Sequence, residues 1–412
     1  MRITYLAQYF ITPQASGSTR AYEFARRLVD RGHQVCVITS NAMLPSPYRD
    51  LSKTTPMMIE GIPTIVIPVT YSNRMSFRRR IGAFLKFAVL ASIQAAKTPA
   101  DIVFATSTPL TIAIPGLVGK WWRRVPFVLE VRDLWPELPI AMGALQNPVA
   151  RWLASALEWL AYQQAAHVIA LSPGMKAGIL RRGIDKAQVT VIPNASDVQR
   201  FDIPTPVPDP IRERLKLAPE QPLVVYAGTF GRINGVSYIV EIAAAALANA
   251  PDMHFLLIGD GAEFEHIQQL AHARGVLDVN LSIWKSIPKV EVPLVLASAS
   301  MALSIFIPLP AMWNNSANKF FDSLAAGKPI AINYQGWQAE LIERTGAGIV
   351  LPAAEPTRAA ELLSAFLHDT SRLKRASAAA RQLAYEDFER DRLFDLFEQV
   401  LIHAAAAADK TV

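Results

Sequence analysis

Six prolines crowd into residues 201–222, close to the middle of this 412-residue chain: Pro204, Pro206, Pro208, Pro210, Pro219 and Pro222. Proline fixes its own backbone and has no amide proton to donate, so a segment this rich in proline is typical of a linker between compact domains. We therefore predict two domains, at residues 1–200 and 223–385. A C-terminal helix at 386–404 is expected to pack back towards the first domain, and 405–412 to form a frayed tail.

The composition, with 51% hydrophobic and 18% charged residues, indicates a compact soluble protein. Cys36 is the single cysteine, which excludes an intrachain disulfide. The first residues contain no apolar run of the kind found in signal peptides, and the most membrane-like stretch, 81–96, contains Lys86 and is too short to span a bilayer. We therefore expect a cytoplasmic protein.

The first domain opens with a βαβ unit. Residues 3–7 and 34–39 are expected to be buried parallel strands, and the helix between them to span 20–31. In such units ligands bind at the carboxyl ends of the strands, which here is the loop 14–20. Gly17 would let the backbone approach a diphosphate and Arg20 would pair with it, although an ordinary surface loop explains this sequence equally well.

The second domain opens in a similar way, with a strand at 223–227, a glycine-rich loop and an apolar helix at 236–247. A glycine cluster between a strand and a helix is the setting in which backbone N–H groups hold phosphate. The candidate donor-binding residues of this loop are Gly228, Thr229, Phe230, Gly231 and Arg232.

A third candidate segment is 314–332, which we expect to be a loop, a helix capped by Asn315 or Ser316, and a strand after Gly327 and Pro329. Ser316, Asn318 and Lys319 would lie at the helix N-terminus, where a phosphate is favoured. Asp322, one turn further on, would accept hydrogen bonds from a ribose diol. The alternative is an ordinary amphipathic helix with solvated Lys and Asp side chains.

Segment 314–332 resembles the nucleotide-sugar clamp of retaining GT-B glycosyltransferases of family 4. Their usual form is Glu, seven residues, Glu, then Ala-x-Ala-x-Gly-x-Pro. When the two are aligned on Gly327, Asp322 takes the place of the second glutamate and Asn314 that of the first. The run Ser-x-Asn-Lys-Phe-x-Asp is similar to a subgroup that builds O-antigen and capsule polysaccharides, often described as aminofucose transferases.

The resemblance extends over nearly the whole chain. Segment 132–137, Arg-Asp-Leu-Trp-Pro-Glu, resembles a signature of the same subgroup, and 192–197 resembles the family's Ile-Pro-Asn-Gly-x-Asp, with Ala195 in place of glycine. In the glycine loop, Thr229 and Asn234 stand where the wider family has arginine and lysine. The diphosphate charge would then be met by Arg232 with Lys319, by Lys285, and by backbone N–H groups.

This resemblance implies a GT-B fold, with two Rossmann-like α/β domains facing a cleft, and transfer of a sugar from a nucleoside diphosphate, expected to be UDP, to a saccharide on a polyprenyl diphosphate. We expect Arg232 and Lys319 to stabilise the leaving diphosphate, and Asp133, or else Glu137, to act as the catalytic carboxylate. Arg20, Arg132 and Asp133 are the candidate acceptor-binding residues. No cofactor or metal is expected, since the chain has no Asp-x-Asp triplet and no histidines at metal-ligand spacing.

The charge is unevenly distributed. Residues 1–205 contain 23 Lys or Arg against 12 Asp or Glu, whereas 206–412 contain 18 against 23. Nucleic acid is not expected as a partner, because no recognised motif is present and few aromatic residues lie among the basic ones. An anionic membrane fits better: Arg78, Arg79 and Arg80 adjoin Phe77, Phe84 and Phe87, and 121–124 is Trp-Trp-Arg-Arg. The alternative is a helix packed on the sheet with its arginines in water.

Two other functions fit the same sequence pattern. One is a subunit that binds a sugar nucleotide but is inactive or acts as a scaffold, because the loop lacks the family's arginine and lysine. The other is an NAD-dependent or epimerising enzyme with Rossmann domains, since fold alone does not determine chemistry.

Overall fold

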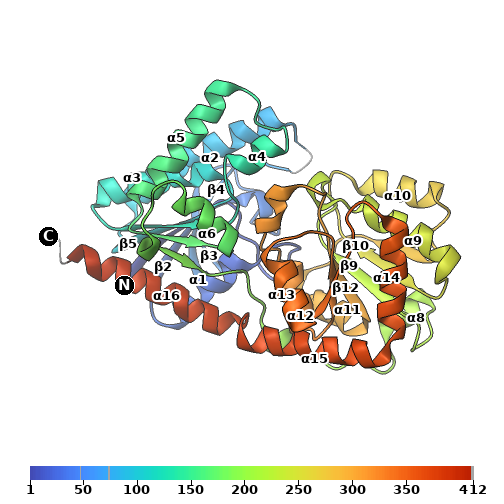
Figure 1. The fold of residues 1–412 in the computed structure, drawn as a ribbon. Helices are drawn as coiled ribbons and strands as arrows, with labels where there is room; N and C mark the ends of the chain where they lie inside the picture. Colours follow the sequence, from blue (N-terminus) through green and yellow to red (C-terminus); the bar gives the residue numbers. More distant parts are fainter. Residues whose placement is uncertain (47, 73–74, 410–412) are drawn as a thin grey trace. The chain divides into compact units, whose positions relative to one another are not determined.

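The computed structural model describes residues 1–46, 48–72 and 75–409 (Figure 1). They form two compact units: unit 1 comprises residues 1–193 and the chain from Arg392 onward, and unit 2 comprises Asn194–Asp391. The boundary follows Pro193 rather than residue 200, because Asn194 and the residues after it make their contacts within unit 2.

Unit 1 is built on an eight-stranded sheet within the described residues, in the order β3-β4-β2-β1-β5-β6-β7-β8. Its strands are β1 Arg2–Ala7, β2 Gln34–Ser40, β3 Thr55–Ile59, β4 Ile62–Ile67, β5 Ile102–Thr106, β6 Phe127–Val131, β7 His167–Ala170 and β8 Val189–Val191. Neighbouring strands pair in parallel except β3, which pairs antiparallel with β4 at the edge of the sheet. Strand β3 was not predicted from the sequence, because its residues include a proline and alternate in exposure.

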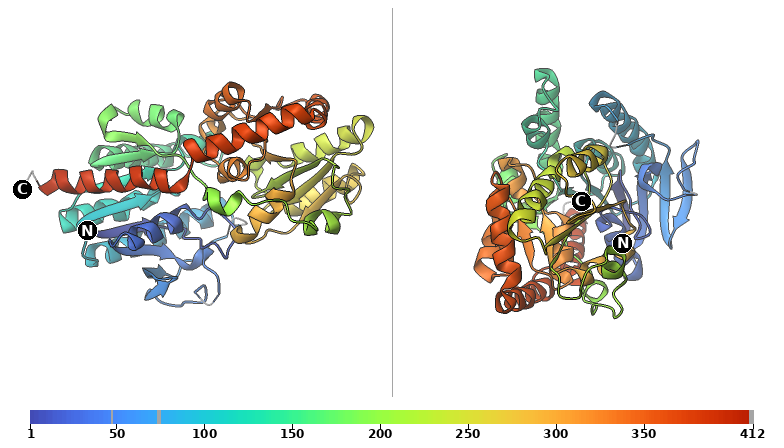
Figure 2. Two further views of the ribbon diagram at one scale, coloured as in Figure 1. Left: turned by 90° about the horizontal axis from the view of Figure 1, so that it is seen from below. Right: turned by 90° about the vertical axis from the view of Figure 1, so that its right-hand side faces the viewer.

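The helices of unit 1 are α1 Arg20–Asp30, α2 Phe77–Lys97, α3 Ala113–Arg123, α4 Glu137–Ala141, α5 Pro148–Gln164, α6 Pro173–Leu180 and most of α16 Arg390–Asp409, with 3-10 turns η1 Asn41–Met43, η2 Leu110–Ile112 and η3 Lys186–Gln188. Helix α16 runs along the sheet of unit 1 (Figure 2). Its Phe397 packs 4.8 Å from Phe24 of α1 and 4.9 Å from Phe104 of β5, measured between ring centroids. Because these three rings are buried, α16 belongs to the core of unit 1.

Unit 2 contains a parallel six-stranded sheet within the described residues, in the order β11-β10-β9-β12-β13-β14. Its strands are β9 Leu223–Ala227, β10 His254–Ile258, β11 Leu281–Trp284, β12 Met301–Ser304, β13 Ile330–Ile332 and β14 Gly348–Val350. These strands are almost continuously buried, as expected for a parallel sheet covered on both faces.

The helices of unit 2 are α7 Val198–Phe201, α8 Pro210–Leu215, α9 Ser237–Asn249, α10 Phe264–Ala273, α11 Val292–Ser298, α12 Asn318–Ala325, α13 Trp337–Thr345, α14 Pro356–His368 and α15 Thr370–Glu386, with 3-10 turns η4 Arg232–Asn234, η5 Lys289–Glu291 and η6 Pro310–Asn314. The proline-rich segment is part of this unit. It forms α8, capped by Asp209, and Arg212 of α8 donates a hydrogen bond to the carbonyl oxygen of Ser298.

Two features of α2 and α12 differ from the sequence analysis. Phe84 and Phe87 are buried in the core of unit 1, so they cannot insert into a membrane, and the side chain of Phe77 lies outside the described part of the chain. Helix α12 begins at Asn318 after Ala317 and has no side-chain cap. Asn315 instead bonds the N–H of Ala317 in the preceding turn. Among the described residues, no helix is both long and apolar enough to cross a membrane.

Candidate active site

The order of the strands determines where each unit can bind a ligand. In unit 2, the chain leaves β9 towards β10 on one side, while β12 pairs with β9 on the other. The loops after β9 and β12 therefore separate at the carboxyl ends of these strands and leave room for a ligand there. In unit 1 the same change of direction occurs between β1 and β5.

Lys319, on the first turn of α12, is the central cation of the unit 2 site. Its Nζ donates a hydrogen bond to the hydroxyl oxygen of Tyr226 at 3.2 Å and lies 4.7 Å from the Tyr226 ring centroid and 4.9 Å from that of Phe306. The Tyr226 hydroxyl in turn donates to the carbonyl oxygen of Thr229 at 2.9 Å, which links Lys319 to the glycine loop. Desolvation by the surrounding protein lowers the pKa of Lys319 to about 7, and no acidic side chain of the described residues forms an ion pair with it.

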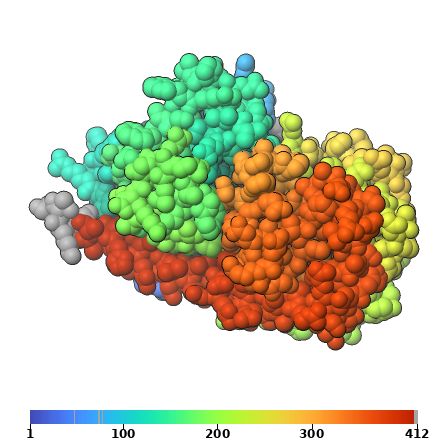
Figure 3. Space-filling model, viewed as in Figure 1, coloured from blue at the N-terminus to red at the C-terminus, as the bar shows by residue number. Residues whose placement is uncertain are grey.

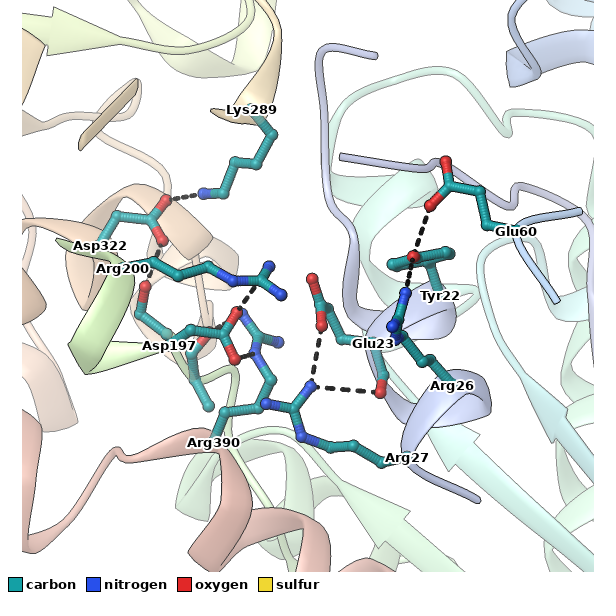
Figure 4. A network of polar contacts seen from close by, with 12 residues as sticks. Tyr22, Glu23, Arg26, Arg27, Glu60, Asp197, Arg200, Lys289, Asp322 and Arg390 are labelled. Atoms are coloured by element: carbon teal, nitrogen blue, oxygen red, sulfur yellow. Dashed lines mark hydrogen bonds and ion pairs between the residues drawn. The ribbon is translucent and has the colours of Figure 1, made fainter. Parts of the chain in front are cut away.

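Asp322 lies near Lys319, and both line a small cavity of about 10 Å³ beside β9. The carboxylate of Asp322 is already held by protein groups: the Ser196 hydroxyl donates to Oδ1 at 2.8 Å, and the Lys289 ammonium pairs with Oδ2 (Figure 4). Asp322 is 5% exposed. The predicted role of Asp322 as the acceptor of hydrogen bonds from a ribose diol is therefore corrected. Its carboxylate instead holds Ser196 and Lys289 in position.

The glycine loop presents backbone and one exposed cation. Thr229 and Arg232 are exposed, Gly228 and Gly231 are half-buried, and Arg232 begins the turn η4. Phe230 points away from solvent and stacks on Phe264 at 5.5 Å between ring centroids. Its predicted role in donor binding is therefore wrong for its side chain, which anchors the loop to the core.

Of the other residues predicted to contact the donor, one is held by a hydrogen bond within the protein and two remain at least partly exposed. The predicted role of Ser316 in donor binding is corrected to a structural one, because the residue is buried and its Oγ accepts a hydrogen bond from the Asn194 backbone N–H at 3.0 Å. Asn318 is half-buried at the start of α12. Lys285 follows directly after strand β11 and is exposed, with its Nζ 3.4 Å from the centroid of the Phe264 ring.

Unit 1 contains a cavity of about 190 Å³ at the carboxyl ends of β1 and β5. Its lining residues are Gln8, Tyr9, Ile11, Ser18, Met43, Tyr71, Thr106, Thr108 and Arg132. Gln8 is fully buried, and neither its Oε1 nor its Nε2 has a hydrogen-bond partner in the described residues. A buried amide without partners is costly, so this cavity suits a ligand that brings both donors and acceptors.

Arg132 and Asp133 follow β6 at the same edge of the sheet. Arg132 donates to the Ser18 hydroxyl at 3.0 Å, and its backbone N–H to Ser107 Oγ at 2.9 Å. Burial raises the pKa of the Asp133 carboxyl, against the opposing effects of the Arg132 charge and of the 3.3 Å hydrogen bond from Thr108. Glu137 is exposed at the start of α4.

Arg20 does not face a ligand. Its side chain has no exposed surface, and it donates to the Glu130 carboxylate at 2.8 and 2.9 Å and to the carbonyl oxygen of Pro193 at 2.7 Å. Its predicted role in acceptor binding is therefore corrected to a structural one, in which it ties α1 to β6 and to the end of unit 1. Gly17 is exposed with φ +134°, and a Cβ there would come within 2.7 Å of Ile11.

Three groups of the two candidate sites were not found from the sequence: Gln8 in unit 1, and Tyr226 and Lys289 in unit 2. Gln8 and Tyr226 lie in or just after strands that read as uniformly buried, and the position of Lys289 opposite Asp322 depends on packing between separate segments. The only available signal was their place near the carboxyl ends of strands. No group of three or more His, Cys, Asp or Glu side chains that could hold a metal occurs in the described part of the chain.

Comparison with known proteins supports this division of the chain. The family described as "Glycosyl transferase 4-like domain" matches residues 17–195, and the family "Glycosyl transferases group 1" matches residues 208–383. The two matches fall almost entirely within units 1 and 2, respectively.

Similar proteins include the alpha-D-kanosaminyltransferase of Streptomyces kanamyceticus, 24% identical over 76% of this chain and 75% of its own length. A putative colanic acid biosynthesis glycosyl transferase, WcaI of Escherichia coli K12, is 23% identical over 62% of this chain and 64% of its own length.

Among solved structures, Anabaena HepE in complex with UDP and glucose superposes with a TM-score of 0.73 at 17% identity, covering 98% of this chain and 100% of that one. WaaG, a glycosyltransferase involved in lipopolysaccharide biosynthesis, superposes with a TM-score of 0.69 at 16% identity, covering 97% and 99%. At this level of identity the structural similarity establishes the fold. With the two family matches, it identifies the chain as a glycosyltransferase of the GT-B fold, composed of a glycosyl transferase 4-like domain and a group 1 glycosyl transferase domain.

Proposed function

We propose that this enzyme transfers a sugar, with retention of anomeric configuration, from a UDP-sugar to a saccharide carried on a polyprenyl diphosphate, in the synthesis of a cell-surface polysaccharide. The observation that carries the proposal is Lys319, a half-buried lysine that has no acidic partner among the described residues and is connected through Tyr226 to the glycine loop. A partly desolvated cation at a helix N-terminus favours binding of an anion, and the diphosphate of a sugar nucleotide provides one.

In the proposed mechanism the leaving diphosphate is stabilised by fixed charges. As the anomeric bond breaks, negative charge grows on the diphosphate, and Lys319, Arg232 and the backbone N–H groups of Thr229 and Gly231 stabilise it, since those of Gly228 and Phe230 already donate to the carbonyl oxygens of Ile258 and Asp260. Asp322 keeps Lys289 and Ser196 in place beside this site. These groups need no metal or cofactor, and we propose that the reaction requires neither.

The acceptor sugar is proposed to bind in unit 1. Gln8 and Arg132 would bind its hydroxyl groups, and Asp133 would take the proton of the attacking hydroxyl. A carboxyl whose pKa is raised by burial is a better proton acceptor than an ordinary aspartate. Support for a polysaccharide product comes from the names of WcaI and WaaG. We propose that the protein works in the cytoplasm, on the inner face of the cell membrane.

The test begins with a thermal-shift screen of nucleoside diphosphates and NAD. We expect UDP to stabilise the protein and NAD to have no effect. Release of UDP from a UDP-sugar should then require a lipid extract that contains the acceptor and should persist in EDTA. Stabilisation by NAD alone would contradict the donor assignment, and UDP binding without turnover on any lipid-linked acceptor would favour a binding subunit.

A further inference from the structure

Unit 1 exposes large apolar side chains on three helices that share one core. Helix α3 packs against both α2 and α5, and all three contribute to the same hydrophobic cluster beneath the sheet. Their outer sides carry Leu85, Val89 and Ile93 on α2, Trp122 on α3, and Trp152 and Trp159 on α5. We call this surface the tryptophan face. Figure 2 shows α2 and α5 projecting from the same side of the sheet, and Figure 3 shows α5 as a ridge on unit 1.

The tryptophan face is not needed for the core. On α2 the core is filled by Phe84, Phe87 and Ala91, whereas Leu85, Val89 and Ile93 repeat every four residues along the opposite side. Trp122 is 74% exposed and Trp152 is 67% exposed. Exposed apolar side chains that cluster on neighbouring helices usually mark a contact surface, so these residues indicate a partner on this side of unit 1.

The exposed charged side chains described on α2 and at the end of α3 are all basic. Arg78, Arg79, Lys86 and Lys97 of α2 are exposed, as is Arg124 at the end of α3. The sequences of α2, α3 and α5 contain one acidic residue, Glu158, which is buried and paired with Arg182 at 2.6 Å. A second copy of this chain would bring like charges together, which disfavours self-association through this surface.

Tryptophan with arginine and lysine is the composition of proteins that rest on bilayers. Indole rings favour the headgroup level of a membrane, and basic side chains are attracted to anionic lipids. We propose that the tryptophan face is the surface by which the protein docks on an anionic lipid bilayer, with the Trp122 and Trp152 rings among the headgroups. This proposal rests on the proposed function, because a lipid-linked acceptor has to be reached at the bilayer surface.

The test is co-sedimentation with vesicles of phosphatidylethanolamine and phosphatidylglycerol, compared with vesicles of phosphatidylcholine alone. The full-length protein should pellet with the anionic vesicles, and its tryptophan emission should shift to shorter wavelength. Trp122→Ser/Trp152→Ser should lower the partition coefficient at least ten-fold and abolish the emission shift. Arg78→Glu/Arg79→Glu should lower it by a similar factor at low salt and by less at high salt, because salt screens the attraction.

The matched control is Met58→Ser/Val279→Ser, which removes two exposed apolar side chains outside the tryptophan face. It should bind vesicles as the wild type does. Equal binding by the wild type and the tryptophan variant, or no binding by the wild type, would overturn the proposal. A wild-type dimer that dissociates in the tryptophan variant would also overturn it in favour of self-association.

Separate measurements test the docking proposal and the transferase assignment, so one can fail without the other. The tryptophan variant should keep the thermal shift caused by UDP, because its substitutions lie in unit 1 on exposed helix surfaces. If UDP binds but vesicles do not, the docking proposal fails and the transferase assignment stands. If vesicles bind but UDP does not, the donor assignment fails and the docking surface stands.

Discussion

The polar side chains of this protein differ in whether other groups of the chain already form hydrogen bonds or ion pairs with them. Arg20 and Asp322 look like ligand-binding residues in the sequence, yet each has protein partners at hydrogen-bond distance. Lys319 and Gln8 are the opposite case. In the part of the chain that the structure describes, Lys319 is half-buried with no acidic partner, and the side-chain amide of Gln8 is buried with no hydrogen bond. Unsatisfied buried groups are the better guide to where a ligand binds.

Replacing Lys319 with methionine should weaken UDP binding by roughly ten-fold to over a hundred-fold, since a charge-assisted hydrogen bond contributes about 1.5–3 kcal/mol. Lys328→Met is the control. Lys328, just beyond the end of α12, is another half-buried lysine whose pKa is lowered by burial, to about 8. Its Nζ donates a hydrogen bond to the carbonyl oxygen of Ala297 in α11. Calorimetry should show normal UDP affinity for that variant; a similar loss in both variants would point to a general effect on the fold.

Lys319 also predicts a pH dependence. Its pKa is about 7 in the free protein, and a bound diphosphate would raise it, so the complex holds more protons than the free protein above pH 7. UDP affinity should therefore fall as the pH rises from about 7 to about 9. Titrations at pH 8 in buffers of different ionisation enthalpy should show proton uptake in the wild type. Equal uptake in Lys319→Met would assign it to another group.

The pair of Asp322 and Lys289 predicts a stability effect. Asp322→Ala leaves a largely buried ammonium without its partner, which should lower the free energy of unfolding by about 3 kcal/mol. The double variant Lys289→Met/Asp322→Leu should recover most of that loss, because it removes both charges. Urea unfolding measures both changes. An Asp322→Ala protein as stable as the wild type would show that the pair contributes little.

At the scale of elements, the C-terminal helix is the segment whose role depends most on packing. Helix α16 places Phe397 against rings of α1 and β5, and Asp395 and Glu398 pair with Arg31. The last helix of the sequence is therefore part of the core of the unit that contains the first strand.

Phe397→Ala should lower the free energy of unfolding by about 3–5 kcal/mol, the usual cost of removing a buried aromatic ring. The adjacent Leu396 is 40% exposed and provides the control. Leu396→Ala should change stability by less than about 1 kcal/mol. Chemical denaturation followed by circular dichroism compares the two, and equal losses would mean that α16 is held by other contacts.

For the whole molecule, the two units are proposed to have separate tasks, with the donor bound in unit 2 and the acceptor in unit 1. Each site lies where the order of strands changes direction, between β9 and β12 or between β1 and β5. Substitutions in one unit should therefore affect one substrate.

Gln8→Met should raise the KM for the acceptor at least ten-fold, because it removes the amide group that lines the unit 1 cavity, where the acceptor is proposed to bind. It should leave the affinity for UDP unchanged, because UDP is proposed to bind in unit 2. The folded protein should be as stable as before or more so, since the amide has no partner to lose. Met43→Leu, on the same cavity wall, is the control and should change the KM little. Weaker UDP binding in Gln8→Met would contradict the separation of tasks.

The sequence by itself determined the α/β class and the strands at whose ends the candidate sites lie. Buried parallel strands read as short apolar runs, and the glycine-rich loop after β9 marks its carboxyl end. Lys319 and Arg132 could be predicted as ligand-binding residues because each lies in the sequence beside such a strand. The likeness to GT-B enzymes was likewise visible in local motifs, and the two family matches agree with it.

Only the tertiary structure decided which of the candidate side chains remain available. Arg20 is used by Glu130, 110 residues away, and Asp322 by Ser196, 126 residues away. The outer side of α2 could be told from its inner side only when Phe84 and Phe87 were seen in the core. Burial and pairing depend on contacts between distant segments, whereas periodicity and turn signals are properties of neighbouring residues, which is why the fold was predictable and the assignment of individual side chains was not.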